Sequence, residues 1–119
     1  MREILFRGKR KDNGKWEEGY YRVGSWHKNH MIDSAHSPYS SEVTPDTVGQ
    51  YTGLNDKNGV KIFEWDIVKT DFFDKPAVVY FDHGTFITSG MYLTETHDET
   101  MIVIGNYFDN PELLEGKDA

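Results

Sequence analysis

The dipeptide Asn13-Gly14 is the feature that most restricts how this chain can fold. Residues 2–8, which precede it, alternate apolar and polar side chains as a half-buried strand does. A second strand-like segment, residues 16–23, follows it. Asn-Gly supplies the two positive-φ residues of a type I′ turn, a common two-residue connection between antiparallel strands. The sequence therefore predicts that the chain opens with a β-hairpin.

Further turn signals divide the rest of the chain into short strands. Residues 55–59 and 82–85 each predict a tight turn, and Pro76 separates two β-prone segments. Aromatic residues make up 14% of the sequence while leucine and alanine are scarce, which favours strands over helices. Polar residues 24–42 predict either a weak strand pair or an exposed loop, and residues 94–100 predict a loop. Expected strands cover residues 44–54, 60–63, 64–69, 77–81, 86–88 and 101–104. We expect a mainly β protein.

A helix signal lies near the end of the chain. Asn110 is a residue type that caps helices, and Pro111 suits the first helical position. Glu112 would interact favourably with the positive end of the helix dipole. Leu113 and Leu114 would pack this turn against the body of the protein. The pattern predicts a short C-terminal helix of one or two turns.

Length and composition restrict the class of protein. A chain of 119 residues can form one domain that buries roughly two thirds of its unfolded surface. The absence of cysteine excludes disulfides and cysteine-ligated zinc, and it suits a reducing cytoplasm. The first residues run directly into charge, unlike a signal peptide, and apolar clusters such as residues 77–81 are too short to cross a bilayer. We expect a cytoplasmic protein that does not bind membranes.

Charge is unevenly distributed along the chain. The formal net charge is −7, but the first 40 residues hold 8 Lys and Arg against 5 Asp and Glu, and the remainder holds 5 against 15. An acidic protein is poorly suited to general nucleic-acid binding, because contacts to phosphates supply most of that affinity. Opposite charges on one chain can instead steer two copies together. The charge pattern therefore favours self-association over nucleic-acid binding.

A basic cluster surrounds the expected opening turn. Its members are Arg7, Lys9, Arg10, Lys11 and Lys15, with Trp16 beside them. Three interpretations stay open, and we rank them in this order. The cluster is a solvated hairpin tip, a contact with the acidic part of another copy, or a nucleic-acid patch that combines positive charge with a stacking aromatic ring.

Histidines and paired carboxylates form no defined catalytic or metal site in the sequence. The histidines are His27, His30, His36, His83 and His97. His27 and His30 would point to opposite faces of a strand, so their spacing does not indicate a metal site. Glu64 and Asp66 would share a strand face, but a role for Asp66 in bonding backbone amides at the strand start explains it better than catalysis. We predict no catalytic, cofactor-binding or metal-ligating residues.

Three segments of the chain carry a recognisable pattern. The first runs from Arg7-Gly8-Lys9-Arg10 to Tyr20, the second from Thr47 to Val68, and the third is residues 104–114, which contain Gly-Asn-Tyr-Phe-Asp-Asn-Pro-Glu. Together they cover about half of the chain, with variable loops between them. In content and order they resemble the YopX family of phage and prophage proteins.

The resemblance implies an SH3-like small barrel joined to an N-terminal β element. It also implies phage origin and a bacterial cytoplasm, and it carries over no activity and no site residue. We expect one domain, residues 1–119. Within it, residues 1–45 would form the N-terminal element, and residues 46–119 would form the barrel and the short C-terminal helix.

Trp65 departs from the pattern of the family. The resembling proteins commonly carry glycine at this position, between the Glu and the Asp of a Phe-Glu-Gly-Asp-Ile-Val segment. If the backbone at this position takes a positive φ, tryptophan carries a strain cost that glycine does not. A large exposed aromatic residue here would also suit a contact surface.

The expected function is that of a phage or prophage accessory protein. We expect it to be non-enzymatic and to bind itself or an unidentified phage or host protein. The alternative is a weak nucleic-acid-binding module that uses the basic hairpin. A small hydrolase that uses Glu64, Asp66 and loop histidines ranks last. The expected interaction surface consists of Arg7, Lys9, Arg10, Lys11, Lys15, Trp16 and Trp65.

Overall fold

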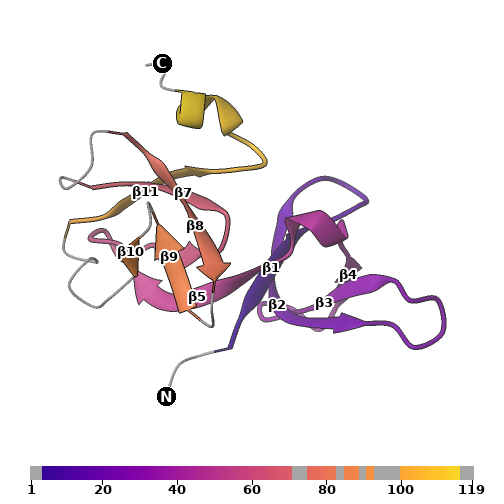
Figure 1. Cartoon of the computed structure of the whole chain (residues 1–119). Coiled ribbons are helices and arrows are strands. Elements are labelled where there is room, and N and C mark those ends of the chain that lie inside the picture. Colours follow the sequence, from indigo (N-terminus) through magenta and orange to yellow (C-terminus); the bar gives the residue numbers. More distant parts are fainter. Residues whose placement is uncertain (1–3, 71–74, 83–84, 89–90, 93–99, 116–119) are drawn as a thin grey trace. The chain divides into compact units, whose positions relative to one another are not determined.

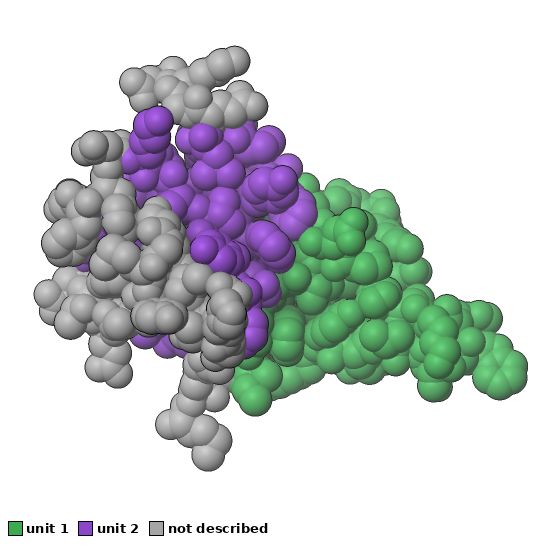
Figure 2. Space-filling view, viewed as in Figure 1, with its two compact units in different colours: residues 1–51 green, residues 52–119 purple. Residues whose placement is uncertain are grey.

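The computed structural model describes residues 4–70, 75–82, 85–88, 91–92 and 100–115. The described part is mainly β, as predicted, and its strands form two antiparallel sheets (Figure 1). The chain divides into two compact units, which we call unit 1 (residues 1–51) and unit 2 (residues 52–119) (Figure 2). Each unit is described separately below.

Unit 1 is built around a meander of short strands. Its described elements are β1 (Phe6–Lys9), β2 (Trp16–Val23), β3 (His30–Ser34), β4 (Ser40–Glu42) and the 3₁₀ segment η1 (Pro45–Thr47). The sheet has the strand order β4-β3-β2-β1-β5-β6, and β5 (Gly49–Asn55) begins in unit 1 and ends in unit 2. The predicted opening hairpin is confirmed, because β1 pairs with β2 and Lys9 lies opposite Trp16. Of the two interpretations of residues 24–42, the strand pair is the one observed.

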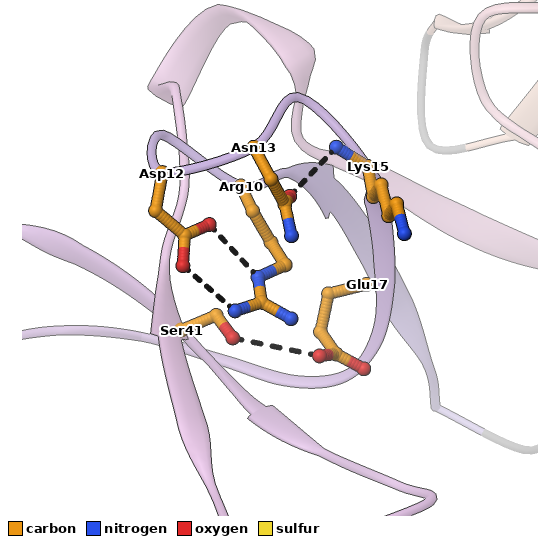
Figure 3. Close-up of polar contacts among 6 residues, drawn as sticks. All are labelled: Arg10, Asp12, Asn13, Lys15, Glu17 and Ser41. Atoms are coloured by element: carbon orange, nitrogen blue, oxygen red, sulfur yellow. Dashed lines mark hydrogen bonds and ion pairs between the residues drawn. The ribbon is translucent and has the colours of Figure 1, made fainter.

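The loop of this hairpin differs from the expected type I′ turn. Only Gly14 of the Asn-Gly pair has a positive φ, +72°. The backbone N–H of Arg10 donates to the carbonyl of Lys15 at 2.9 Å, so the loop spans residues 11–14 rather than two residues. The Asn13 side chain accepts a hydrogen bond from the Lys15 N–H at 2.9 Å (Figure 3). The Asn-Gly pair therefore shapes a four-residue loop.

The end of β4 returns to the end of β1. The Lys11 N–H donates to the Glu42 carbonyl and the Thr44 N–H donates to the Lys9 carbonyl, each at 2.9 Å. Between these bonds, Arg10 and Val43 form an isolated antiparallel bridge. Glycine is needed at position 19 of β2, because a Cβ there would overlap the backbone of Asp33 in β3. Leu5, Ile32, Val43 and Tyr51 are the buried apolar residues of unit 1.

Unit 2 holds the second sheet, with the strand order β10-β9-β8-β7-β11. Its strands are β6 (Lys61–Phe63), which belongs to the first sheet, β7 (Asp66–Lys69), β8 (Ala77–Asp82), β9 (Thr85–Thr88), β10 (Met91–Tyr92) and β11 (Ile102–Asn106). Ile62, Val68, Val79 and Met101 form its buried cluster. The β8–β9 pairing confirms the hairpin expected at residues 82–85.

Two features of unit 2 differ from expectation. Among the described residues β10 and β11 are the two outer strands of an open sheet, so the strands form no closed barrel and the SH3-like arrangement is not confirmed. The predicted C-terminal helix is a 3₁₀ segment of five residues, η3 (Pro111–Glu115), which follows Asn110.

In the described part of the chain, no helix has the length and apolar character needed to cross a membrane.

Candidate functional site

The side chains of the basic hairpin divide between two faces. Arg7 and Lys9 lie on the same face as Trp16, because Lys9 is directly opposite Trp16 and side chains alternate along a strand. The Arg7 guanidinium carbon is 4.7 Å from the centre of a Trp16 ring, and the Lys9 ammonium is 5.6 Å away. These distances are those of cation–π contacts. The structure thus brings together three of the predicted surface residues.

Two other basic residues pair with carboxylates of unit 1. Arg10 donates two hydrogen bonds to Asp12, at 3.1 and 2.8 Å (Figure 3), and Lys11 lies 3.1 Å from the Glu42 carboxylate. The bond with Asp12 raises the pKa of Arg10, and the same bond lowers the pKa of Asp12. Lys15 is exposed at the end of the loop. Sequence reasoning missed these pairings, which offset the positive charge of the hairpin.

A shallow hollow of about 330 Å³ lies beside these pairs. It is lined by Arg10, Lys11, Asp12, Ser40, Ser41 and Glu42. The Ser41 hydroxyl donates to Glu17 at 3.4 Å (Figure 3), and the Ser34 hydroxyl donates to the other oxygen of that carboxylate at 3.0 Å. Because the lining contains both signs of charge in bonded pairs, it favours neither an anionic nor a cationic ligand.

Trp65, the remaining predicted residue, has an unusual backbone. It occupies the turn between β6 and β7 with φ of +76°, the conformation that favours glycine. A bulky residue in this region costs about 1–3 kcal/mol. Its N–H donates to the Val79 carbonyl and its carbonyl accepts from the Tyr107 N–H, both at 2.8 Å. Two neighbouring segments of unit 2 therefore hold the strained conformation in place.

The Trp65 side chain is half-buried in an aromatic cluster, which consists of Trp65, Tyr107 and Phe108. The ring centres of Trp65 lie 6.1 Å from those of Tyr107 and Phe108, and the latter two rings are 5.4 Å apart. The interplanar angles of 41°, 72° and 84° are in the range of tilted and edge-to-face packing. Tyr107 is 47% exposed. Sequence reasoning found Trp65 but missed its two partners, although Tyr-Phe stands in the third recognisable segment.

Of the two carboxylates singled out from the sequence, Asp66 bonds to the backbone, and Glu64 is half-buried in the turn between β6 and β7. Asp66 is 1% exposed and accepts a hydrogen bond from the Phe63 N–H at 2.8 Å, as a residue that closes the turn before β7 would. Asp56 is also buried and accepts bonds from the N–H groups of Asn58, Val60 and Val103 at 2.8–3.0 Å. Burial acts to raise the pKa of Asp56, but these backbone bonds outweigh it and hold that pKa below its usual value.

The histidines lie apart in the described structure. The ring of His30 stacks on Tyr21 at 5.8 Å and shares a hydrogen bond with the tyrosine hydroxyl. His36 lies 3.7 Å from the Glu18 carboxylate, and His27 is exposed. The side chains of His83 and His97 are outside the described part of the chain. Among described residues, no group of three or more His, Asp or Glu side chains is placed to hold a metal ion.

Unit 1 also exposes large aromatic side chains that sequence reasoning did not single out. Trp26 is 88% exposed, Tyr39 is 75% exposed and Tyr20 is 62% exposed. Trp26 lies in the turn between β2 and β3, which is closed by a 2.7 Å hydrogen bond from the Gly24 N–H to the Asn29 carbonyl. The turn therefore exposes the Trp26 side chain to solvent on a backbone that is held by a hydrogen bond.

Comparison with known proteins identifies the family. The YopX protein family matches residues 5–115, nearly the whole chain. The chain belongs to the YopX family. It is similar in fold to the crystal structure of protein EF1440 from Enterococcus faecalis, with a TM-score of 0.65 and 24% sequence identity over 96% of this chain and 99% of the other. No curated protein matches the chain.

Proposed function

We propose that this YopX-family chain is a non-enzymatic protein-interaction module encoded by a phage or prophage and active in the bacterial cytoplasm. The observation that carries the proposal is the exposure of Trp26, Tyr39 and Tyr20 on the bonded backbone of unit 1. Tyrosine and tryptophan are enriched at the centres of protein interfaces, where they bury large areas at low entropic cost.

The magnitude of this exposure supports an interface. A tryptophan side chain buries about 150–250 Å² when it is covered. At about 25 cal/mol per Å², covering Trp26 would contribute roughly 4–6 kcal/mol before the costs of association are subtracted. Tyr20 adds to the same unit from the face of β2 that carries Trp16, because the two residues are an even number of positions apart. A partner that covered both Trp26 and Tyr20 would gain from each ring.

A second copy of the chain is the partner that we test first. Unit 1 contains 8 Lys and Arg and 7 Asp and Glu, whereas unit 2 contains 5 and 13. A nearly neutral aromatic unit can approach an acidic unit of another copy without strong repulsion, whereas two acidic units repel. Self-association through unit 1 therefore has both apolar area and tolerable electrostatics in its favour.

Sedimentation velocity across micromolar concentrations tests this function. We expect a defined oligomer that Trp26→Ala combined with Tyr20→Ala shifts to monomer. Tyr107→Ala is the matched control, because it removes an exposed aromatic residue from unit 2, and we expect it to leave the oligomer intact. A wild-type protein that stays monomeric at every concentration, at low and high salt, contradicts self-association.

Nucleic-acid binding is the second candidate, and the contact of Arg7 and Lys9 with Trp16 is the observation that favours it. Cationic side chains beside an aromatic ring are used to bind single strands. Because Arg10 and Lys11 pair with carboxylates, few cationic side chains of the hairpin are left to neutralise phosphates. We expect at most weak binding to an oligothymidylate, lost by about 200 mM salt. Sub-micromolar binding at physiological salt that Trp16→Ala abolishes would make this the leading function.

A further inference from the structure

We infer that the aromatic cluster of unit 2 is a docking site for an arginine-bearing segment of a partner protein. This site deepens the proposed function by naming the chemistry of a partner. It rests on a different unit from the aromatic residues that carry self-association, so the two can fail independently.

The first argument is the retained strain at Trp65. Glycine would adopt φ of +76° without penalty, and the backbone bonds to Val79 and Tyr107 do not depend on the side chain. The indole is the feature that a glycine would lack. Backbone outliers of this kind concentrate at functional sites, where surrounding structure holds them. The indole therefore has a use that offsets the strain, and its contacts place that use at the aromatic cluster.

The second argument is the geometry of the rings. The Tyr107 and Phe108 rings are nearly perpendicular, at 84°, and the Trp65 rings lie 6.1 Å from each. Tyr107 is 47% exposed, while Trp65 and Phe108 are half-buried. The cluster is therefore packed against the protein through two of its rings and is accessible to solvent at the third. An exposed aromatic surface with ring faces at several orientations can contact a flat guanidinium by stacking as well as by its charge.

The third argument is charge. The segment around Trp65, residues 61–69, carries Lys61 and Lys69 at its ends and Glu64 and Asp66 between them, and residues 102–115 carry Asp109, Glu112 and Glu115 with no Lys, Arg or His. Unit 2 as a whole has 13 Asp and Glu against 5 Lys and Arg. A cationic ligand would therefore be attracted to this part of the chain, and an anionic one repelled. Of the described arginines, Arg10 and Arg22 bond to Asp12 and Asp33, and Arg7 packs against the ring of Trp16, which argues for a separate protein rather than a second copy.

A titration with hexa-arginine amide, monitored by the NMR resonances of the indole N–H groups, tests the inference. The resonance that disappears in Trp65→Gly identifies Trp65, and this variant keeps a residue suited to the left-handed backbone. We expect the wild-type Trp65 resonance to shift on addition of the peptide. The dissociation constant from calorimetry should rise at least fivefold in Trp65→Gly and in Tyr107→Ala.

Matched controls separate the aromatic contribution from general charge. Trp26→Ala removes an exposed tryptophan from unit 1 and should leave the affinity unchanged. Hexa-lysine amide has the same charge without the planar guanidinium and should bind more weakly.

Equal binding of the peptide to wild type and to Trp65→Gly would show attraction by net charge alone and would overturn the inference. The absence of binding at low salt would overturn it as well. Loss of wild-type oligomers in Trp65→Gly would overturn it in favour of a second copy as the occupant. Failure of the peptide titration with self-association intact would remove this site and leave the proposed function standing.

Discussion

Units 1 and 2 use their polar residues in different ways. In unit 1 the charged side chains form pairs at the surface, such as Arg10 with Asp12 and Arg22 with Asp33. In unit 2 two buried carboxylates, Asp56 and Asp66, bond to backbone N–H groups. Surface pairs contribute little to stability, whereas a buried acceptor of several backbone bonds cannot be lost without leaving those groups unsatisfied. Asp56 and Asp66 both lie in the second recognisable segment, so that segment holds residues on which the folding of unit 2 depends.

The largest effect that separates the units is expected from Asp56→Ala. The substitution would leave the N–H groups of Asn58, Val60 and Val103 without their acceptor. We expect the free energy of unfolding to fall by about 2–4 kcal/mol, measured by urea denaturation. Asp12→Ala is the control in unit 1 and should leave the denaturation midpoint unchanged. Equal losses in the two variants would contradict the distinction between the units.

The next largest effect is the loss of folding stability at low pH. The pKa of Asp56 is lowered in the folded protein, so its contribution is present above the ordinary pKa of about 3.9 and is lost as the pH falls through the folded value. We expect stability to decline below about pH 4, and Asp56→Asn to show a flatter decline over that range. Urea denaturation at a series of pH values measures both slopes. Parallel slopes in the two proteins would mean that other carboxylates cause the acid sensitivity.

A smaller effect is expected at Trp65. Trp65→Ala and Trp65→Gly lose the same contacts with Tyr107 and Phe108, but only alanine keeps a Cβ in the left-handed conformation. We therefore expect the glycine variant to be the more stable by about 1 kcal/mol. At Tyr20, which lies within a strand of unit 1, we expect Tyr20→Ala to be more stable than Tyr20→Gly. Thermal denaturation of the four variants compares the two positions, and an alanine advantage at both would show that Trp65 is not strained.

The smallest effect is expected from metal. Among the described residues of both units, no group of three or more His, Asp or Glu side chains is placed to hold a metal ion. Stoichiometric zinc or a chelator should therefore leave the melting temperature unchanged. A rise of several degrees with zinc, which binding to the folded state would cause by mass action, would contradict this expectation.

Local patterns predicted the fold better than they predicted the site. The opening hairpin, the 82–85 turn and the structural role of Asp66 depend on residues close in sequence, and the structure confirms all three. The exact loop at Asn13-Gly14 was mispredicted, because the four-residue loop depends on where β1 and β2 stop pairing. Open or closed sheet geometry is likewise set by distant strands.

The candidate site depends on contacts that no local pattern contains. Trp65 meets Tyr107 and Phe108, more than 40 positions further along the chain. The positive φ at Trp65 was the one part within reach, because the glycine usual in the resembling proteins indicated it. The pairing of Lys11 with Glu42 joins segments about 30 residues apart, so the charge of the hairpin was overestimated.

The return of β4 onto the end of β1 has a consequence for how copies of the chain can meet. A bare outer strand is a template on which a foreign strand can add, and it is a common starting point for aggregation. Here the Glu42 carbonyl and the Thr44 N–H are already bonded to Lys11 and Lys9. This margin of unit 1 is therefore protected against β-augmentation at those positions. Any partner that binds there must recognise side chains, and its affinity will respond to single substitutions in a way that backbone pairing would not.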